Sequence, residues 1–332
     1  IKGKATIRRE KTIEVVGESG KEYLRAKNII IATGAKPIMP NIPGINLPGV
    51  INSDRLLAVP TWNYDRIVIM GGGVIGVEFA TIFQALCSKV TIVEKGPHLL
   101  GPMDEEVSEA LKEQLVKKGI TVYCNAMVEE IQREEGLVCT VRHLLTDETT
   151  QIKTNQVVVA VGRAPYTEGL LGEDMSLQIE HGRPVVNADF ETSEPGIYAI
   201  GDVSAKTQLA HVAMAQATYV IENLAGKPHT IRLEAVPNGM FVSLPIVPSC
   251  IYTEPEIATV GITEARAGEL GMKVRCGVYD MGENGKSIIA REEHGFIRLI
   301  FEAYSNTIVG AQMMCPRATD MIGEMATAIA NG

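Results

Sequence analysis

Short, mainly apolar runs mark the predicted strands in the N-terminal part of the chain. Residues 28–32 form one such run, and its apolar character is typical of a strand buried on both faces of a sheet. Before it, alternation over 12–16 and a glycine-bounded turn at 17–20 predict a β-hairpin. After it, the segment 37–50 holds four prolines and two glycines and predicts a connector. From residue 66 the pattern changes to strand, glycine turn, helix and strand, the βαβ unit of a parallel sheet.

Helical periodicity is clearest over residues 104–118. The predicted buried stripe of this helix consists of Val107, Ala110, Leu111 and Leu115. Acidic residues at its start and lysines at its end complement the helix dipole, and Gly119 ends it. Further strands are predicted at 120–124, 137–145, 156–161 and 197–200, and a further helix at 207–225.

The pattern changes again at residue 245. Alternating strands are predicted around 249–260, 273–280, 296–302 and 307–313, followed by a helix from 317. That helix carries an apolar stripe of Met321, Ile322, Met325 and Ile329. Such a stripe suits either a core or a subunit interface. The C-terminal part is therefore predicted to be an α+β domain with an antiparallel sheet.

Composition narrows the function classes. With 332 residues, two or three domains are expected, and 45% hydrophobic with 21% charged residues is ordinary for a globular protein. A net charge of -9 without basic patches argues against nucleic acid as a partner. The apolar runs are too short to span a bilayer, and no charged-then-apolar leader opens the chain, so neither a membrane nor secretion is indicated.

The six cysteines are scattered: Cys87, Cys124, Cys139, Cys250, Cys276 and Cys315. They show no CxxC or Cys/His spacing, and the six histidines are equally dispersed, so no metal site is expected. We expect buried, reduced thiols in a cytoplasmic protein.

The glycine turn predicts a dinucleotide site. Gly71-x-Gly73-x-x-Gly76 follows a strand (66–70), opens a helix (74–86) and leads to a second strand that ends in Glu94. In this context the first glycine makes the turn, the second admits the pyrophosphate and the third lets helix and strand pack closely. The helix N-terminus, with Gly72, Val74 and Ile75, offers amide hydrogens to phosphate. Glu94 is expected to bind the adenosine ribose and to repel a 2′-phosphate, which indicates NAD rather than NADP.

Two other strands end in small residues. One breaks at Thr33-Gly34, after Ala32, and the other at Gly201-Asp202. A backbone can approach a ligand closely at such places, although each signal alone is weak.

The order of these segments resembles the pyridine-nucleotide disulfide oxidoreductases, a family of flavoenzymes. The resemblance covers nearly the whole chain. It rests on IIIATGAKPIMPNIPG (29–44), GGGVIGVEFA (71–80), VAVGRAP (159–165), PGIYAIGDV (195–203), YTEPEIATVG (252–261) and VGAQMMCPRATDMIGEMATAI (309–329). Glu94 and the helix AHVAMAQA (210–217) bring it nearest to the members that oxidise dihydrolipoamide with NAD.

The resemblance implies a role for further residues. Glu78, Gly162 and Arg163 would lie on the nicotinamide side of NAD, and Val128 would flank the adenine. FAD would be bound by Ala32, Thr33, Gly34, Gly201, Asp202, Leu209, Ala210 and His211. Of these, Thr33 and Gly34 would contact its ADP half and Asp202 its ribityl chain. A helix N-terminus at 209–211 would favour negative charge on the reduced flavin ring.

The resemblance also implies a fold. It is an α/β architecture in which a Rossmann-like NAD domain (61–167) is inserted in a partial FAD-binding domain (1–60 and 168–240), followed by an α+β dimerisation domain (241–332). The expected partners are a second copy of the chain, as a homodimer, and a lipoyl-bearing protein or a small disulfide substrate.

Three parts of the family pattern are not found in these residues: the FAD-binding GxGxxG, the redox CxxxxC pair and the HPxxxE segment. The nearest cysteines, Cys124 and Cys139, are fifteen residues apart. We therefore expect a chain truncated at both ends, without catalytic residues of its own, that does not turn over lipoamide. Two alternatives stay open. One is a member that acts on oxygen, peroxide or mercuric ion, and the other is a catalytically empty dinucleotide-binding dimer module.

Overall fold

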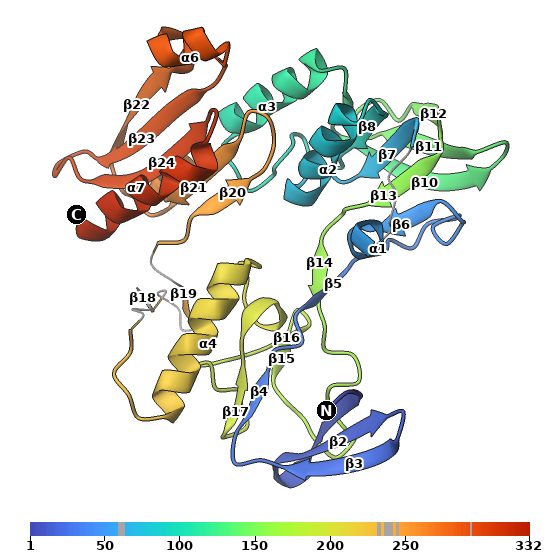
Figure 1. Ribbon diagram of the computed structural model, residues 1–332, viewed down its shortest axis with the longest axis vertical. Helices are drawn as coiled ribbons and strands as arrows, with labels where there is room; N and C mark the ends of the chain where they lie inside the picture. Colours follow the sequence, from blue (N-terminus) through green and yellow to red (C-terminus); the bar gives the residue numbers. More distant parts are fainter. Residues whose placement is uncertain (59–63, 231–233, 236–241, 244–245, 293) are drawn as a thin grey trace. The chain divides into compact units, whose positions relative to one another are not determined.

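The computed structural model describes residues 1–58, 64–230, 234–235, 242–243, 246–292 and 294–332. The chain forms two compact units (Figure 1). The first unit consists of Ile1–Lys36 with Arg163–Pro245, and the second of Pro37–Gly162 with Ile246–Gly332. Each unit is thus assembled from two separate stretches of sequence.

The second unit is built on a five-stranded parallel sheet with the strand order β6-β13-β7-β8-β9. The bounds of its strands are β6 Val50–Asn52, β13 Gln156–Val159, β7 Arg66–Met70, β8 Lys89–Val93 and β9 Thr121–Tyr123. Helices α1 (Ser53–Ala58), α2 (Val74–Ala85) and α3 (Glu105–Lys117) pack their apolar side chains with one face of this sheet. Alternate strand residues divide between the faces: Ile67 and Ile69 contact the helices, whereas Val68 and Met70 point the other way.

An antiparallel sheet of β10 (Ala126–Arg133), β11 (Leu137–His143) and β12 (Thr149–Thr154) covers the opposite face. Buried Val128, Ile131 and Cys139 pack there against the parallel strands. Both faces of the parallel sheet are therefore covered, which agrees with its nearly continuous apolar strands.

The C-terminal part of the second unit is a five-stranded antiparallel sheet in the order β20-β21-β24-β23-β22. Its elements are β20 Ser249–Ile251, β21 Ile257–Gly261, α5 Glu264–Glu269, β22 Val274–Asp280, α6 Gly285–Ala290, β23 Phe296–Glu302, β24 Ile308–Met314 and α7 Ala318–Asn331. Helix α7 packs on one face through Ile322. The other face gives Ile251, Ile257 and Met314 to the core that α2 and α3 share.

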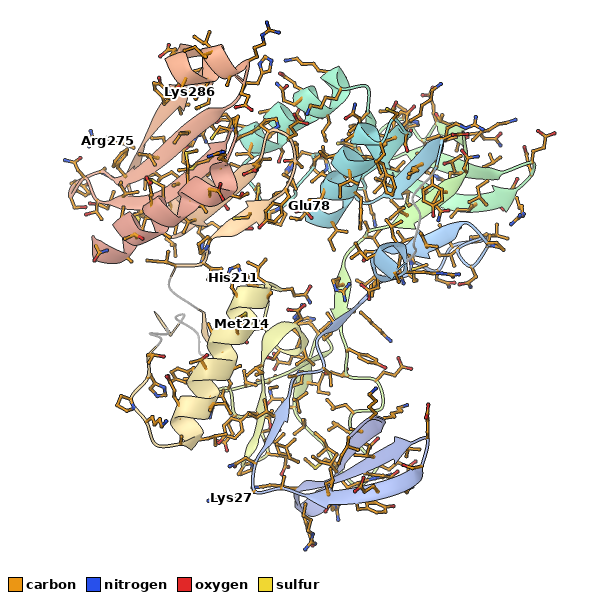
Figure 2. The ribbon with its side chains drawn as sticks, in the orientation of Figure 1. Lys27, Glu78, His211, Met214, Arg275 and Lys286 are labelled. Carbon is orange, nitrogen blue, oxygen red and sulfur yellow. The ribbon has the colours of Figure 1, made fainter. Side chains whose placement is uncertain are left out.

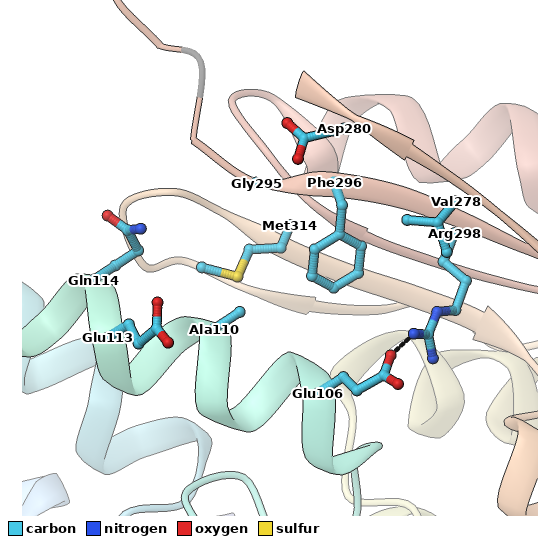
Figure 3. A pocket seen from close by; sticks show the side chains of 10 residues that line it. All are labelled: Glu106, Ala110, Glu113, Gln114, Val278, Asp280, Gly295, Phe296, Arg298 and Met314. Atoms are coloured by element: carbon cyan, nitrogen blue, oxygen red, sulfur yellow. Dashed lines mark ion pairs between the residues drawn. The ribbon is translucent and has the colours of Figure 1, made fainter. Parts of the chain in front are cut away.

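Polar ties reinforce that shared core. Arg298 of β23, which is only 7% exposed, pairs with Glu106 at the start of α3 (Figure 3). It also pairs with Glu264 at 3.2 Å. Lys118, just after α3, pairs with Glu254 at 2.7 Å. Helix α3 and strands β22, β23 and β24 line an open pocket of about 330 Å³, in which Phe296 is one of the lining residues (Figure 3). Apolar burial and these ion pairs together explain why residues 37–162 and 246–332 form one unit.

The first unit contains a three-stranded antiparallel sheet of β1 (Lys4–Arg8), β2 (Thr12–Gly17) and β3 (Gly20–Arg25). It also contains a parallel pair, β4 (Ile29–Ile31) with β17 (Ile197–Ala199), in which Ile29 lies opposite Ile197. Helix α4 (Ala210–Leu224) packs on this pair through Val220. The remaining strands are β5 Ala35–Pro37, β14 Arg163–Pro165, β15 Ile179–Glu180, β16 Arg183–Pro184, β18 Glu234–Ala235 and β19 Val242–Ser243, and 3-10 turns lie at Arg9–Lys11, Gly201–Val203 and Met281–Glu283.

Most predicted elements are confirmed within a few residues, including the hairpin, α2, α3 and the C-terminal strands. The helix predicted over 207–225 begins later than expected, at Ala210. The expectation that the cysteines are buried holds for Cys139 and Cys315 only. Cys124 and Cys250 are half-buried, and Cys87 and Cys276 are exposed. Cys87 follows the last turn of α2, and Cys276 lies on the edge strand β22, and neither location gives a side chain full cover. All six thiols are free, as expected.

The buried aromatic core of α2 yields a stability prediction. Phe83 is fully buried and its ring lies 6.0 Å from that of Tyr64, so Phe83→Ala should lower the free energy of unfolding by about 3–5 kcal/mol through lost burial and an unfilled cavity. Its neighbour Ile82 is 38% exposed, and Ile82→Ala should cost less than about 1 kcal/mol. Urea unfolding of both variants measures the difference. Equal losses would contradict the described packing of α2.

Candidate functional site

The turn between β7 and α2 requires two glycines for steric reasons. Gly71 has a φ of +104°, and a Cβ added there would lie 2.4 Å from the carbonyl oxygen of Ala160. A Cβ on Gly76 would lie 2.0 Å from the carbonyl oxygen of Gly71. Helix α2 can therefore begin directly against the end of β7 only because both positions lack a side chain.

Gly73 is different, because it faces open space. A Cβ added at Gly73 would meet no atom within 4 Å. The first hydrogen bond of α2 runs from the amide of Val77 to the carbonyl of Gly73 at 3.0 Å, so the amides of Val74 and Ile75 precede the intrahelical ladder. An open approach to helix N-terminal amides, with partial positive charge, suits a diphosphate.

Glu94 lies directly after β8, and its carboxylate points to the glycine turn. Its two oxygens accept the backbone amides of Gly72 at 2.5 Å and Gly96 at 2.6 Å. A carboxylate oxygen can accept more than one hydrogen bond, so sugar hydroxyls can still be bound by this group. The arrangement places a negative charge at the rim of the turn, as the expected ribose contact requires.

The loop after Glu94 closes around the turn. The amide of Leu100 donates to the carbonyl of Gly72 at 2.9 Å, and Leu99 packs so closely that a Cβ on Gly72 would lie 2.5 Å from its methyl carbon. Sequence reasoning assigned no role to Leu99 or Leu100. The sequence signal that could have found them is the adjacent leucine pair soon after Glu94, and the structure shows that both side chains are fully buried.

The parallel strands bring Gly162 to the same edge of the sheet as Gly71 and Glu94. Strand β13 pairs with β7, and the amide of Ala160 donates to the carbonyl of Met70 at 2.8 Å. Gly162 follows two residues later and its carbonyl accepts the amide of Ile38 at 3.0 Å. The expected nicotinamide-side glycine therefore belongs to the edge that holds the glycine turn.

Val128 and Arg163 lie in different surroundings from this edge. Val128 is only 4% exposed and packs within the core between the two sheets, so its side chain presents little surface to a ligand. Arg163 belongs to the first unit, where it donates to the carbonyl of Ala35 at 2.6 Å. The adenine and nicotinamide roles of these two residues stay predictions.

Glu78 lies on α2 and reaches the part of the chain that forms the C-terminal antiparallel sheet, residues 246–332, called the antiparallel domain below (Figure 2). Its carboxylate oxygen accepts the backbone amide of Tyr252 at 3.0 Å. Burial raises the pKa of the Glu78 carboxyl above its ordinary value, and this hydrogen bond partly offsets that rise. The contact joins the helix of the glycine turn to the loop between β20 and β21.

In the first unit, the expected FAD residues gather at the carboxyl edge of β4 and β17. Ala32, Thr33 and Gly34 follow β4, and Gly201 and Asp202 follow the parallel strand β17. The Thr33 hydroxyl donates to a backbone carbonyl at 2.6 Å, which holds its strand end in place. The carboxylate of Asp202 is half-buried and makes no hydrogen bond within the described part of the chain, so it is available to a hydroxyl ligand.

The N-terminal end of α4 lies in the same unit. Leu209 is the N-cap residue, and its side chain makes no capping hydrogen bond. Ala210 and His211 are exposed, and Met214 is 70% exposed (Figure 2). The end therefore offers amide hydrogens and partial positive charge without competition from an N-cap side chain.

Metal and membrane features are not found in the described residues. No group of three or more histidine, cysteine, aspartate or glutamate side chains is placed to hold a metal ion among the residues that the structure describes. Within the same residues, no helix has the length and apolar character that crossing a membrane requires.

Sequence profiles identify the relatives of the chain. The profile described as pyridine nucleotide-disulphide oxidoreductase matches residues 1–217, and the profile of that family's dimerisation domain matches residues 247–332. A dihydrolipoyl dehydrogenase of Chlorobaculum tepidum is 36% identical over 311 residues, which is 93% of this chain and 64% of the relative. One of Bacillus subtilis is 34% identical over 323 residues, 96% of this chain and 65% of the relative. The chain thus spans just under two thirds of the length of these relatives.

Solved structures show the same fold. The HOCl-induced flavoprotein disulfide reductase RclA of Escherichia coli is 26% identical with a TM-score of 0.85, and the match covers 99% of this chain and 72% of that one. LpdA of Mycobacterium tuberculosis, at 23% identity and a TM-score of 0.84, covers 100% of this chain and 71% of its own, and supports the fold alone. The fold class expected from the sequence is confirmed.

The two kinds of glycine in the turn can be separated by mutation. Gly73→Ala should leave the free energy of unfolding within about 1 kcal/mol of the parent, because its methyl group enters open space. It should nevertheless weaken NADH binding at least about tenfold, because that space is where we expect the diphosphate. Gly76→Ala should instead destabilise the fold by about 1–3 kcal/mol, because its methyl group collides with the Gly71 carbonyl.

Calorimetric NADH titration and urea unfolding of the same samples distinguish the two effects. NADH binding by Gly73→Ala at parental affinity would contradict the placement of the diphosphate at this turn.

Proposed function

We propose a function from one premise: the chain belongs to the pyridine nucleotide-disulphide oxidoreductase family. Members of this family use FAD and NAD(P). We propose that the chain is part of an FAD-dependent, NAD-linked disulfide oxidoreductase. Its reaction is that of a dihydrolipoyl dehydrogenase, which converts dihydrolipoamide and NAD⁺ into lipoamide and NADH.

The observation that carries this proposal is the Glu94 carboxylate at the rim of the glycine turn. It lies 2.5 Å from the amide of Gly72, beside the open approach over Gly73. A carboxylate there binds ribose hydroxyls and repels a 2′-phosphate, which favours NAD over NADP. The relatives named dihydrolipoyl dehydrogenase support the choice of reaction.

When bound, the two cofactors supply hydride transfer between nicotinamide and flavin. In the second unit, the helix N-terminus at Gly73–Gly76 binds the diphosphate and Glu94 the ribose. Glu78 and Gly162 line the nicotinamide side, and Val128, although its side chain is buried, is kept as the residue beside the adenine. Glu78 is held toward the antiparallel domain by the Tyr252 amide, so its carboxyl has a fixed direction.

In the first unit, the strand end at residues 32–34 binds the ADP half of FAD. Asp202 binds the ribityl hydroxyls with its carboxylate. The N-terminal end of α4, at Leu209–His211, stabilises negative charge on the flavin ring. For His211 a backbone contact is proposed rather than a proton-carrying role.

The proposed partners follow from the same premise. A homodimer is supported by the dimerisation-domain match over residues 247–332, and a lipoyl-bearing protein is the proposed substrate. The division into a partial FAD domain, a NAD domain and a dimerisation domain, and the cytoplasmic location, are kept as proposals. The second candidate is a flavoenzyme of the same family whose substrate is not dihydrolipoamide, and the likeness to the flavoprotein disulfide reductase RclA favours keeping it.

The Glu94 carboxylate provides the first test. Glu94→Gln keeps the shape of the side chain but turns one acceptor into a donor that faces a backbone amide. NADH affinity should fall about tenfold or more, and the preference for NADH over NADPH should narrow because the negative charge is lost. Lys95→Ala, a change at the exposed neighbouring residue, is the control and should bind NADH with little change. Calorimetric titration with both nucleotides measures these affinities, and an unchanged NADH preference in Glu94→Gln would refute the assignment.

Redox titration tests the reaction itself. In these 332 residues no two cysteines are closer than fifteen positions in the sequence, so the CxxxxC pair that would exchange electrons with lipoamide is not among them. Purified chain reconstituted with FAD should show visible flavin absorption that bleaches when NADH is added without oxygen. Dihydrolipoamide should not bleach the flavin, and no NADH should form from NAD⁺. Failure to bind FAD would contradict the flavin assignment, whereas steady NADH production from dihydrolipoamide would contradict the need for a neighbouring cysteine pair.

A further inference from the structure

One buried hydrogen bond joins two elements of the first unit that the proposed function assigns to the flavin. Gln216 on α4 is only 3% exposed, and its side-chain oxygen Oε1 accepts the backbone amide of Gly201 at 2.7 Å. Buried glutamine in a helix is uncommon, since its amide group must find partners away from water. Here the partner belongs to the turn that carries Asp202.

The end of a strand creates the need for this acceptor. Strand β4 ends at Ile31, whose carbonyl accepts the amide of Ile200 at 3.0 Å. The next amide, that of Gly201, points away from β4, because Ile200 is extended and successive amides of an extended chain point to opposite sides. A buried amide without an acceptor is costly, and Gln216 supplies the acceptor that the two-stranded sheet does not.

The same turn is held on its other side. The backbone carbonyl of Asp202 accepts hydrogen bonds from the guanidinium of Arg183 at 3.4 Å and from the side-chain amide of Gln208 at 3.5 Å. A Cβ added to Gly201 would lie 3.1 Å from the Cβ of Ala213, which is three residues before Gln216 on the same helix face. The backbone of the turn is therefore fixed against α4, while the Asp202 carboxylate has no hydrogen-bond partner among the described residues.

We propose that Gln216 is a positioning residue of the flavin site. By holding the turn against α4, it fixes the distance between the Asp202 carboxylate, which we assign to the ribityl chain, and the N-terminal end of α4, which we assign to the flavin ring. This inference rests on the proposed function, because the flavin roles of Asp202 and α4 are part of it.

Three variants test the proposal by two readouts. Gln216→Leu removes the acceptor at similar volume, Gln216→Glu keeps an acceptor oxygen, and Met214→Leu changes an exposed residue of the same helix. Site-resolved amide hydrogen exchange should show at least tenfold faster exchange of the Gly201 amide in Gln216→Leu. Exchange at Gly201 should stay near the parental rate in Gln216→Glu and Met214→Leu.

Flavin fluorescence titration of the same samples should show FAD affinity at least tenfold weaker in Gln216→Leu, and largely restored in Gln216→Glu. Loss of affinity in both Gln216 variants with unchanged exchange at Gly201 would overturn the proposal. If Gln216→Leu does not fold, Gln216→Asn, whose shorter side chain does not reach Gly201, takes its place. Absence of FAD binding by the parent chain would contradict the proposed function, and faster Gly201 exchange in the variant would still decide whether Gln216 holds the turn.

Discussion

The close approach of two backbone segments at the glycine turn determines how the second unit presents its sheet edge. Helix α2 starts so near the end of β7 that a Cβ on Gly76 would lie 2.0 Å from the Gly71 carbonyl oxygen. Because the helix begins there, its N-terminal amides face the carboxyl edge of the sheet rather than the core. The amide of Gly72 then lies within hydrogen-bonding distance of Glu94. A buried strand, a turn and a carboxylate 22 residues further along the sequence thus form one site.

The packing of the rest of the unit keeps this edge in place. Apolar residues of α2, α3 and the antiparallel domain share one core, and the contact of Glu78 with the Tyr252 amide extends the connection to the helix of the turn. The domain matched by the dimerisation profile is thereby joined to the helix that we assign to NAD. In the first unit, Gln216 accepts a hydrogen bond from the Gly201 amide, just as Glu94 accepts one from the Gly72 amide in the glycine turn. In both units a side chain supplies an acceptor to an amide at a strand end.

Local signals carried most of what the sequence predicted. The stripe Val107, Leu111 and Leu115 and the charged ends of α3 are features of neighbouring residues, so that helix could be placed within a residue. The link between the glycine turn and Glu94 followed from the strand–turn–helix–strand pattern, whereas the place of Gly162 came from the family resemblance. The sheet partners of residues 126–133 and 149–154 were not foreseen, because their alternation is weak and their pairing depends on distant strands. The burial of Val128 was not foreseen either, because it depends on how two sheets face each other. The role of Gln216 was also missed, because no local pattern reveals it.

A crystal structure of the chain with NAD tests the central claim most directly. We predict the diphosphate over Gly73, within hydrogen-bonding distance of the amides of Val74 or Ile75, and the adenosine ribose on the carboxylate of Glu94. A dinucleotide bound elsewhere on the chain, or one whose ribose makes no contact with Glu94, would contradict this claim.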